Sequence, residues 1–281
     1  MAAIAPTVGT PEQGRRGPER TGRRGGLVLW IVTALGFVYL FVPIIWIVVF
    51  SFNQPRGKFN YLWQEFTLDN WSDPFRDPGM TEAFWKSLQV AAISVTAATV
   101  MGALMALALA RYRFRGGVLM DILLVLPLTT PEIVMGASLL TLFVDQGRER
   151  GFWTIVIAHT MFCLAFVALT VKARIRGFDW GLEDAAADLG AGPWTAFRRV
   201  TFPLILPGIL AAALLSFALS IDDYIITSFV AGSTRTFPLQ VFDAARVQVS
   251  PQINVLATMI LVVSVVVLIG TSIFGARRAA R

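Results

Sequence analysis

The chain has 281 residues, of which 56% are hydrophobic and only 15% are charged. A soluble domain of this length carries more charge and a clear alternation of polar and apolar residues, so the composition excludes an ordinary soluble protein. The net charge is +6, but the arginines border apolar blocks, and we therefore expect membrane lipid and no nucleic acid as their partner.

Six apolar blocks follow one another along the chain, each long enough for a membrane span of roughly 20 residues. They cover about residues 27–50, 86–110, 118–144, 152–172, 203–231 and 252–275. None has the alternating pattern of a membrane barrel. Because a helix satisfies its own backbone groups in lipid, we expect an all-α integral membrane protein with six transmembrane helices over residues 27–276.

The segments outside the spans indicate the orientation. Residues 1–26 are rich in Gly, Pro and Arg and are expected to be a disordered basic segment, and residues 277–281 a short tail. These two segments and the loops after the second and fourth blocks hold 16 of the 24 lysines and arginines. The positive-inside rule then places both termini in the cytoplasm, in agreement with six spans. The first block reads as an uncleaved anchor.

The second and third blocks contain local features of packing and bending. Small residues at 98–110 favour close contact between helices. In the third block, Pro127 and Pro131 are expected to kink or unwind the helix, and broken helices at membrane depth often line a cavity. Glu132 follows directly. Asp121, near the other end of this block, is expected at the interface.

The fourth block holds the single histidine and the single cysteine, His159 and Cys163. Without the spacing of a zinc site, both are better explained by packing or hydrogen bonding than by metal binding or catalysis. The pattern G-x-x-x-x-G-K-[ST] is also absent from the sequence. We therefore expect no catalytic residue, no metal site and no cofactor bound by this chain.

The loop at about 175–202 reads as a short amphipathic helix. Asp179 is expected to be its N-cap, and Glu183 and Asp184 lie in the first turns, where the helix dipole favours acids. One small apolar face follows from helical spacing; its residues are Leu182, Ala185, Ala186 and Leu189. Such a face could dock in a groove of another protein, although composition alone favours an ordinary helical connection.

The second part of this loop contains residues that typically end one helix and begin the next. Gly190 is expected to end the helix in the left-handed conformation, and Pro193 to begin a second short helix. That helix places Trp194 and Phe197 on one side. Pro203 and Pro207 then mark the entry to the fifth block.

Within the fifth block lie Asp222 and Asp223, followed by Tyr224. A charge inside lipid costs roughly 2.5–3.5 kcal/mol, so intramembrane acids tend to face a cavity or to pair with other groups. Lining a path and structural pairing stay equally open for Glu132 and Asp222. Neighbouring helical residues point about 100° apart, so the two aspartates are not expected to share one role.

The stretch "EDAAADLGAGPWTAFRRVTFPLILPGI" (183–209) resembles the EAA motif of bacterial ABC importer permeases, with Asp184 in place of the usual Glu. In that family the segment is the coupling helix that contacts the ATP-hydrolysing subunit. The resemblance implies a type I ABC importer transmembrane domain and a set of ATPase-coupling residues. These residues are Glu183, Asp184, Ala185, Ala186, Leu189, Gly190, Pro193 and Pro203.

Further segments are similar to the second membrane subunit of spermidine/putrescine-type permeases, among them "SFN" (51–53), "TPEIVMG" (130–136) and "SIDDYIITSFVAG" (220–232). The resemblance implies a non-catalytic subunit that forms half of a polyamine path. Carboxylates and an aromatic face would replace the hydration of the ammonium groups. The candidate path residues are Glu132, Asp222, Asp223 and Tyr224.

The same resemblance implies the partners: a second permease subunit in a heterodimer, two ATPase subunits that carry ATP and Mg²⁺, and an extracytoplasmic polyamine-binding protein. The location implied is the bacterial inner membrane. Two alternatives remain: a permease for another small solute such as iron or thiamine, or an ion-coupled secondary transporter. The second usually shows repeated halves, which the sequence lacks. A non-transporting scaffold would leave the intramembrane acids unexplained.

Overall fold

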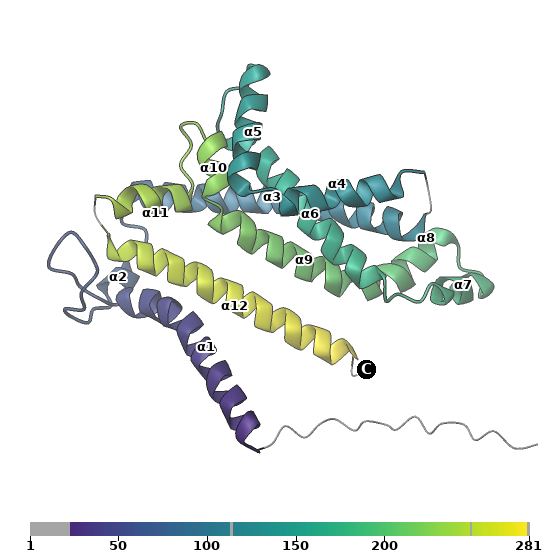
Figure 1. Cartoon of the computed structure of the whole chain (residues 1–281), viewed down its shortest axis with the longest axis horizontal. Coiled ribbons are helices and arrows are strands. Elements are labelled where there is room, and N and C mark those ends of the chain that lie inside the picture. The colour runs from purple at the N-terminus through teal and green to yellow at the C-terminus, as the bar shows by residue number, and fades with distance from the viewer. Residues whose placement is uncertain (1–22, 113–114, 248, 280–281) are drawn as a thin grey trace, which may run out of the picture. The chain divides into compact units, whose positions relative to one another are not determined.

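A computed structural model describes residues 23–112, 115–247 and 249–279 (Figure 1). Its elements are α1 (Arg23–Phe50), α2 (Asp69–Ser72), α3 (Pro78–Arg111), α4 (Gly117–Thr129), α5 (Glu132–Asp145), α6 (Phe152–Ile175), α7 (Gly181–Asp188), α8 (Pro193–Ala196), the π-helix η1 (Phe197–Thr201), α9 (Phe202–Asp222), α10 (Ile225–Val230), α11 (Phe237–Ala245) and α12 (Pro251–Ala279). Over these residues the only β pairing is two isolated bridges. The expected all-α class is confirmed. Residues 1–22 of the predicted disordered segment lie outside the described part.

The chain divides into two compact units, residues 1–46 and 47–281. Most of α1 belongs to the first unit, and its stretch Leu27–Phe50 is apolar enough to span a membrane, with a mean hydropathy of 2.5. The second unit contains the other helices and all of the sites discussed below.

Three long helices form the centre of the second unit. α3, α6 and α9 pack along one another, and α4 contacts α6 (Figure 1). Small residues permit the close approach of α3 to α6, as predicted for 98–110. A Cβ added at Gly102 would lie 2.9 Å from the side chain of Val167 and 3.1 Å from the backbone nitrogen of Ala168.

Replacing Gly102 by leucine is expected to force α3 away from α6. Overpacking of this kind lowers the free energy of unfolding by about 1–3 kcal/mol. The measurement is thermal unfolding of the purified protein in detergent. Gly117→Ala is the matched control, because a Cβ at Gly117 would meet nothing within 4 Å. Equal unfolding temperatures for the two variants would contradict the close packing described here.

Two of the predicted blocks are broken rather than continuous. The third block forms α4 and α5, which meet at Thr130 and Pro131 with a bend of 106°. The predicted break is therefore confirmed at Pro131, whereas Pro127 is accommodated inside α4. The fifth block was predicted as one helix over 203–231, and this was wrong. α9 ends at Asp222 and the separate α10 begins at Ile225, because the Asp223 carboxylate bonds to the backbone of the next turn.

The number of spans is only partly tested by the described residues. Within them, four helices are long and apolar enough to cross a membrane, or five if α4 and α5 together form one span. The last helix contributes a shorter apolar stretch, Pro251–Val266. Its first turns pack against α3 and α11 through a cluster that includes Leu256, Phe84 and Phe237. The sixth span therefore stays a prediction.

Buried asparagines organise the segment between α1 and α3. The Asn53 side-chain amide donates to the Asn60 side chain (2.6 Å) and to the Leu62 carbonyl (2.8 Å). Asn70 donates to the backbone carbonyls of Ser51 and Asn53. These bonds hold a segment whose only helix is the single turn α2, because its buried backbone groups need partners from side chains.

Candidate functional site

The loop that contains α7 has the predicted short helix, but the N-cap lies one residue later than predicted. α7 begins at Gly181, and the residue at the N-cap position is Trp180 rather than Asp179. The Asp179 carboxylate accepts a bond from the backbone N–H of Gly181 at 3.0 Å. This is the turn that an aspartate makes with its own backbone two residues on, and it competes with a true cap.

The end of α7 follows the prediction. Gly190 has φ +85°, and the backbone N–H of Ala191 donates to the carbonyl of Ala186 at 3.0 Å, which closes a Schellman-type end. Pro193 begins α8, and the rings of Trp194 and Phe197 stack 5.6 Å apart.

Pro203 lies in the first turn of α9, so it marks the entry to the fifth block as predicted, whereas Pro207 lies inside that helix. α8, η1 and α9 form one helical run from Pro193 to Asp222, so Pro203 does not separate two helices. Pro203 is tolerated because it lies in the first turn assigned to α9, where the π-helix before it has already altered the hydrogen-bond register. The loop therefore continues without a break into α9.

The small apolar face of α7 points away from the rest of the second unit. Leu189 is 90% exposed and Leu182 44% exposed. Ala185 and Asp184 are exposed and Ala186 is half-buried. The face predicted from helical spacing is thus accessible at the end of the second unit where Figure 1 shows α7 and α8.

The side chain of Glu183 is buried, unlike that of the adjacent, exposed Asp184. The residue is only 8% exposed. One carboxylate oxygen lies 2.6 Å from Nη1 of Arg111, at the end of α3, and the other accepts a bond from the Thr201 hydroxyl. The Arg111 guanidinium also lies 5.5 Å from the centre of the Trp180 ring. Sequence spacing could not reveal these contacts, since Arg111 is 72 positions away.

At the other end of α9, the chain breaks at the two aspartates. Asp223 is 9% exposed, and its carboxylate accepts bonds from the backbone N–H of Thr227 (2.8 Å) and from the Thr227 hydroxyl (2.6 Å). His159 Nε2 lies 3.3 Å from the same carboxylate oxygen. The Asp223 carboxylate therefore binds the first turn of α10 and pairs with α6, and its predicted place on the path stays a prediction.

His159 joins the helices around this break. One ring nitrogen bonds to the Ser220 hydroxyl and the other to the Thr227 hydroxyl, both at 2.8 Å. The predicted hydrogen-bonding role is confirmed, and the Asp223 carboxylate also comes close to the ring, because α9 ends at Asp222. Ser220 and Thr227 were missed by sequence reasoning. Cys163 is buried, as expected, with its thiol 3.5 Å from the Ser216 carbonyl.

Asp222 is the aspartate that remains accessible. Its residue is exposed, as is Glu132, the first residue of α5. Both Glu132 and Asp223 are near enough to interact electrostatically with Asp222. Tyr224 is half-buried against Phe242, with ring centres 4.6 Å apart. The predicted path residues therefore gather at one place, where α9 ends and α5 and α10 pack on each other.

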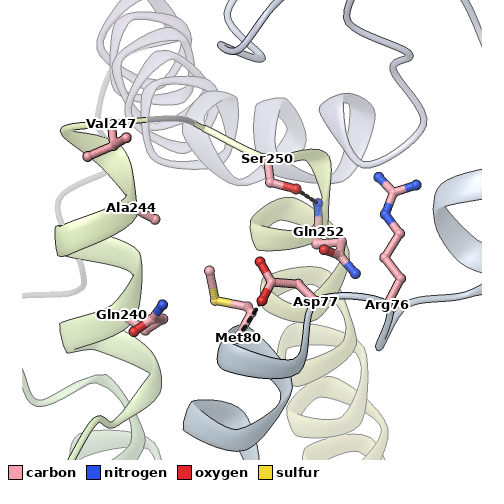
Figure 2. Close-up of a pocket in the computed structure, with 8 residues that line it drawn as sticks. All are labelled: Arg76, Asp77, Met80, Gln240, Ala244, Val247, Ser250 and Gln252. Carbon is pink, nitrogen blue, oxygen red and sulfur yellow. Dashed lines mark hydrogen bonds between the residues drawn. The ribbon is translucent and has the colours of Figure 1, made fainter.

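A polar cavity of about 420 Å³ lies near the start of α3, at the end of the second unit opposite to α7. Figure 2 shows Gln240 and Ala244 on α11 and Val247 just after it on one side, with Asp77 and Gln252 opposite them. Met80, Ser250 and Arg76 complete the lining. Across the described residues, no group of three or more His, Cys, Asp or Glu side chains could hold a metal ion.

Comparison with known proteins adds to this geometry. Residues 98–279 match the family of binding-protein-dependent transport system inner membrane components. The chain is 42% identical to the spermidine/putrescine transport system permease protein PotC of Escherichia coli K12 over 251 residues, which are 89% of this chain and 92% of that one. The chain belongs to the family of binding-protein-dependent transport system inner membrane components. It is therefore a multi-pass inner membrane transport protein.

A second relative in the same organism is the putrescine transport system permease protein PotI, which is 39% identical over 239 residues, 82% of this chain and 84% of that one. Several solved structures share the fold of the present chain, although their sequences are little similar to it. One is a bacterial ABC transporter that imports alginate, with a TM-score of 0.64, 16% identity, and coverage of 90% of this chain and 98% of that one.

Another solved relative is an amino acid ABC transporter, with a TM-score of 0.57, 21% identity, and coverage of 75% and 100%. The fold is thus that of ABC importer transmembrane domains. The family match over 98–279 includes both the α7 loop and the acidic break after α9. Both candidate sites therefore lie in the part of this permease that its family shares.

Proposed function

We propose that this permease forms half of an import path for polyamines. The observation that carries the proposal is the pair of exposed carboxylates, Asp222 and Glu132, gathered at helix breaks in an apolar unit. A polyamine carries several ammonium groups that must lose water on entry, and carboxylates offer charge-assisted hydrogen bonds in exchange. The two relatives named above as permeases for spermidine and putrescine support this substrate class.

The α7 face is proposed to receive a separate ATPase subunit. Leu189, Ala185 and Asp184 are exposed there, and a short rigid helix can dock in a groove of a partner. This chain is proposed to be non-catalytic, with ATP and Mg²⁺ held by the partner. Of the predicted coupling residues, Gly190 and Pro193 shape the turn, while Glu183 acts from inside the loop.

The assembly is proposed to contain this chain, a second permease subunit, two ATPase subunits and an extracytoplasmic polyamine-binding protein. Alternating access requires two membrane halves that move against each other, and a heterodimer fits the resemblance to the second of two subunits. The basic residues Arg111, Lys172 and Arg198 lie at the α7 end, which supports a cytoplasmic position for α7. The cytoplasmic position of both termini stays part of the proposal.

The cavity between α3, α11 and α12 would then face outward. Its lining offers a carboxylate at Asp77 and amides at Gln240 and Gln252. Such a polar hollow suits a protruding side chain of the delivering protein, since non-obligate interfaces depend on polar complementarity.

The test is reconstitution of the complex in proteoliposomes with each candidate binding protein in turn. Stimulation of ATP hydrolysis by the polyamine-loaded protein, together with ATP-dependent polyamine uptake, would support the proposal. Stimulation by an iron- or thiamine-loaded protein instead would assign another solute. Uptake that follows a proton gradient without ATP would favour the secondary transporter.

Replacing Asp222 by asparagine or Glu132 by glutamine is expected to lower polyamine uptake about 10-fold or more, because each change removes a charge-assisted hydrogen bond. Uptake of labelled putrescine is the measurement, with complex assembly checked by co-purification. Asp145→Asn, at the far end of α5, is the matched control. Unchanged uptake in both variants would remove these residues from the path.

A further inference from the structure

The buried carboxylate of Glu183 is not explained by docking of a partner. Its neighbour Asp184 occupies the EAA-motif position and is exposed, whereas Glu183 is 8% exposed and faces the body of the unit. An acid in the first turn of α7 would be favoured by the helix dipole even at the surface. Burial adds a cost that only specific partners can offset.

Those partners come from two different long helices. Arg111 is the last residue of α3 and pairs with one carboxylate oxygen at 2.6 Å. Thr201 is the last residue of η1, which continues into α9, and its hydroxyl donates to the other oxygen. Within the described residues, Glu183 is therefore a three-way connection between α7, α3 and α9.

The connections that join α7 to α6 and to α8 are irregular. α6 ends at Ile175, and the segment up to Trp180 is irregular. On the other side, α7 joins α8 through the left-handed turn at Gly190. A push on the exposed face could bend either connection. The ion pair with the half-exposed Arg111 and the hydrogen bond with Thr201 resist such bending, in addition to the packing of the aromatic rings that precede α7.

Arg111 is restrained by an aromatic contact as well as by its ion pair with Glu183. Its guanidinium stacks over the ring of Trp180, which in turn lies edge-on to Phe178 with ring centres 4.9 Å apart. A cation that is both stacked and paired has little freedom to move. The end of α3 is thereby attached to the start of α7 by two kinds of contact.

We propose that Glu183 is the positioning residue of the coupling loop: its ion pair with Arg111 and its hydrogen bond with Thr201 carry displacement of α7 to α3 and α9. α9 has 21 residues and, at 1.5 Å per residue, extends about 30 Å to the break at Asp222. Motion at α7 thus reaches the acidic break through a continuous helix. The inference rests on the proposed docking of an ATPase at α7.

The experiment uses the complete complex in proteoliposomes and measures solute imported per ATP hydrolysed. The variants are Glu183→Gln, Arg111→Gln and the double variant. Glu183 faces away from the docking face, so the ATPase is expected to remain bound in all three. Each single variant is expected to lower the import per ATP about 10-fold, a size typical of changes in coupling between sites.

The double variant decides whether the two residues act as one unit. If they do, its import per ATP is no lower than that of either single variant, because the second change removes nothing further. A loss equal to the product of the two single losses would show independent actions and overturn the proposed pair. Arg111→Lys, which keeps the charge, is expected to recover part of the coupling.

Asp121→Asn is the matched control, because it removes another ion pair, between Asp121 of α4 and Lys172 of α6, that does not involve the loop. Its import per ATP is expected to equal that of the unaltered complex. A fall as large as in Glu183→Gln would show a general effect of lost ion pairs and overturn the inference. So would unchanged coupling in both single variants.

Failure of the proposed function looks different from failure of this inference. If the unaltered chain neither binds an ATPase nor imports with ATP, the proposed function is wrong, and the inference falls with it. If the unaltered complex imports with ATP and the Glu183 and Arg111 variants do so with the same import per ATP, only the inference is wrong. Binding and coupling are measured separately for this reason.

Discussion

Replacing Leu189 by glutamate is expected to release the ATPase from this permease. Leu189 is 90% exposed at the end of α7 and is the more exposed of the two leucines on the proposed docking face. Placing a charge at a site that binds an apolar side chain typically weakens the free energy of binding by about 2 kcal/mol or more, or roughly 30-fold in affinity. Co-purification of the ATPase with the permease in detergent is the measurement, followed by ATP-dependent uptake.

Val247→Glu is the matched control for this prediction. Val247 is 72% exposed and follows α11 at the opposite end of the unit, so the same chemical change should leave ATPase binding intact. Equal recovery of the ATPase with Leu189→Glu and with the control would contradict docking at the α7 face. The helix itself should survive, because Leu189 contributes little buried area to the fold.

Replacing Asp223 by alanine is expected to lower the free energy of unfolding by about 2–4 kcal/mol, since several buried donors lose their acceptor at once. Those donors are the backbone N–H and hydroxyl of Thr227 and the ring of His159. The start of α10 would lose its cap and α6 its link to the break. Thermal unfolding of the purified protein in detergent gives the measurement.

Asp222→Ala, at the adjacent position, is the variant with which Asp223→Ala is compared. Asp222→Ala removes an exposed carboxylate for which no hydrogen bond or ion pair to another described residue is seen, so unfolding should change little while polyamine uptake falls. The opposite pattern, a stable Asp223→Ala and an unstable Asp222→Ala, would reverse the roles assigned here. The pair thus separates a structural aspartate from a proposed path residue by measuring stability and uptake in the same two variants.

Much of the α7 loop could be predicted because its signals are local. The spacing of Leu182, Ala185 and Leu189 defines one face of a helix, and Gly190 and Pro193 adopt the conformations that their backbone chemistry favours. The same local character allowed the break at Pro131 to be predicted. Where two local preferences compete, the prediction was off by a residue, as at Asp179, whose carboxylate binds the backbone of Gly181.

The misjudged features depend on residues that meet only after folding. Asp223 looked like one more acid in an apolar helix, yet Thr227 and His159 complete its hydrogen bonds and end the helix there. Glu183 was predicted as an acid of the first helical turn and as a coupling residue, and its burial against Arg111 and Thr201 could not be predicted. No local pattern marks these contacts, since the partners come from separate helices.

The amino-acid sequence by itself determined that this protein is helical, apolar enough for the membrane, and equipped with a short amphipathic helix in the loop before α9. Those properties depend on composition and on spacing along one helix, which need no knowledge of distant neighbours. Only the tertiary structure decided which of its acids are buried and which remain accessible. The fate of a carboxylate depends on whether a cation or hydrogen-bond donor from another helix reaches it, and that is a property of packing.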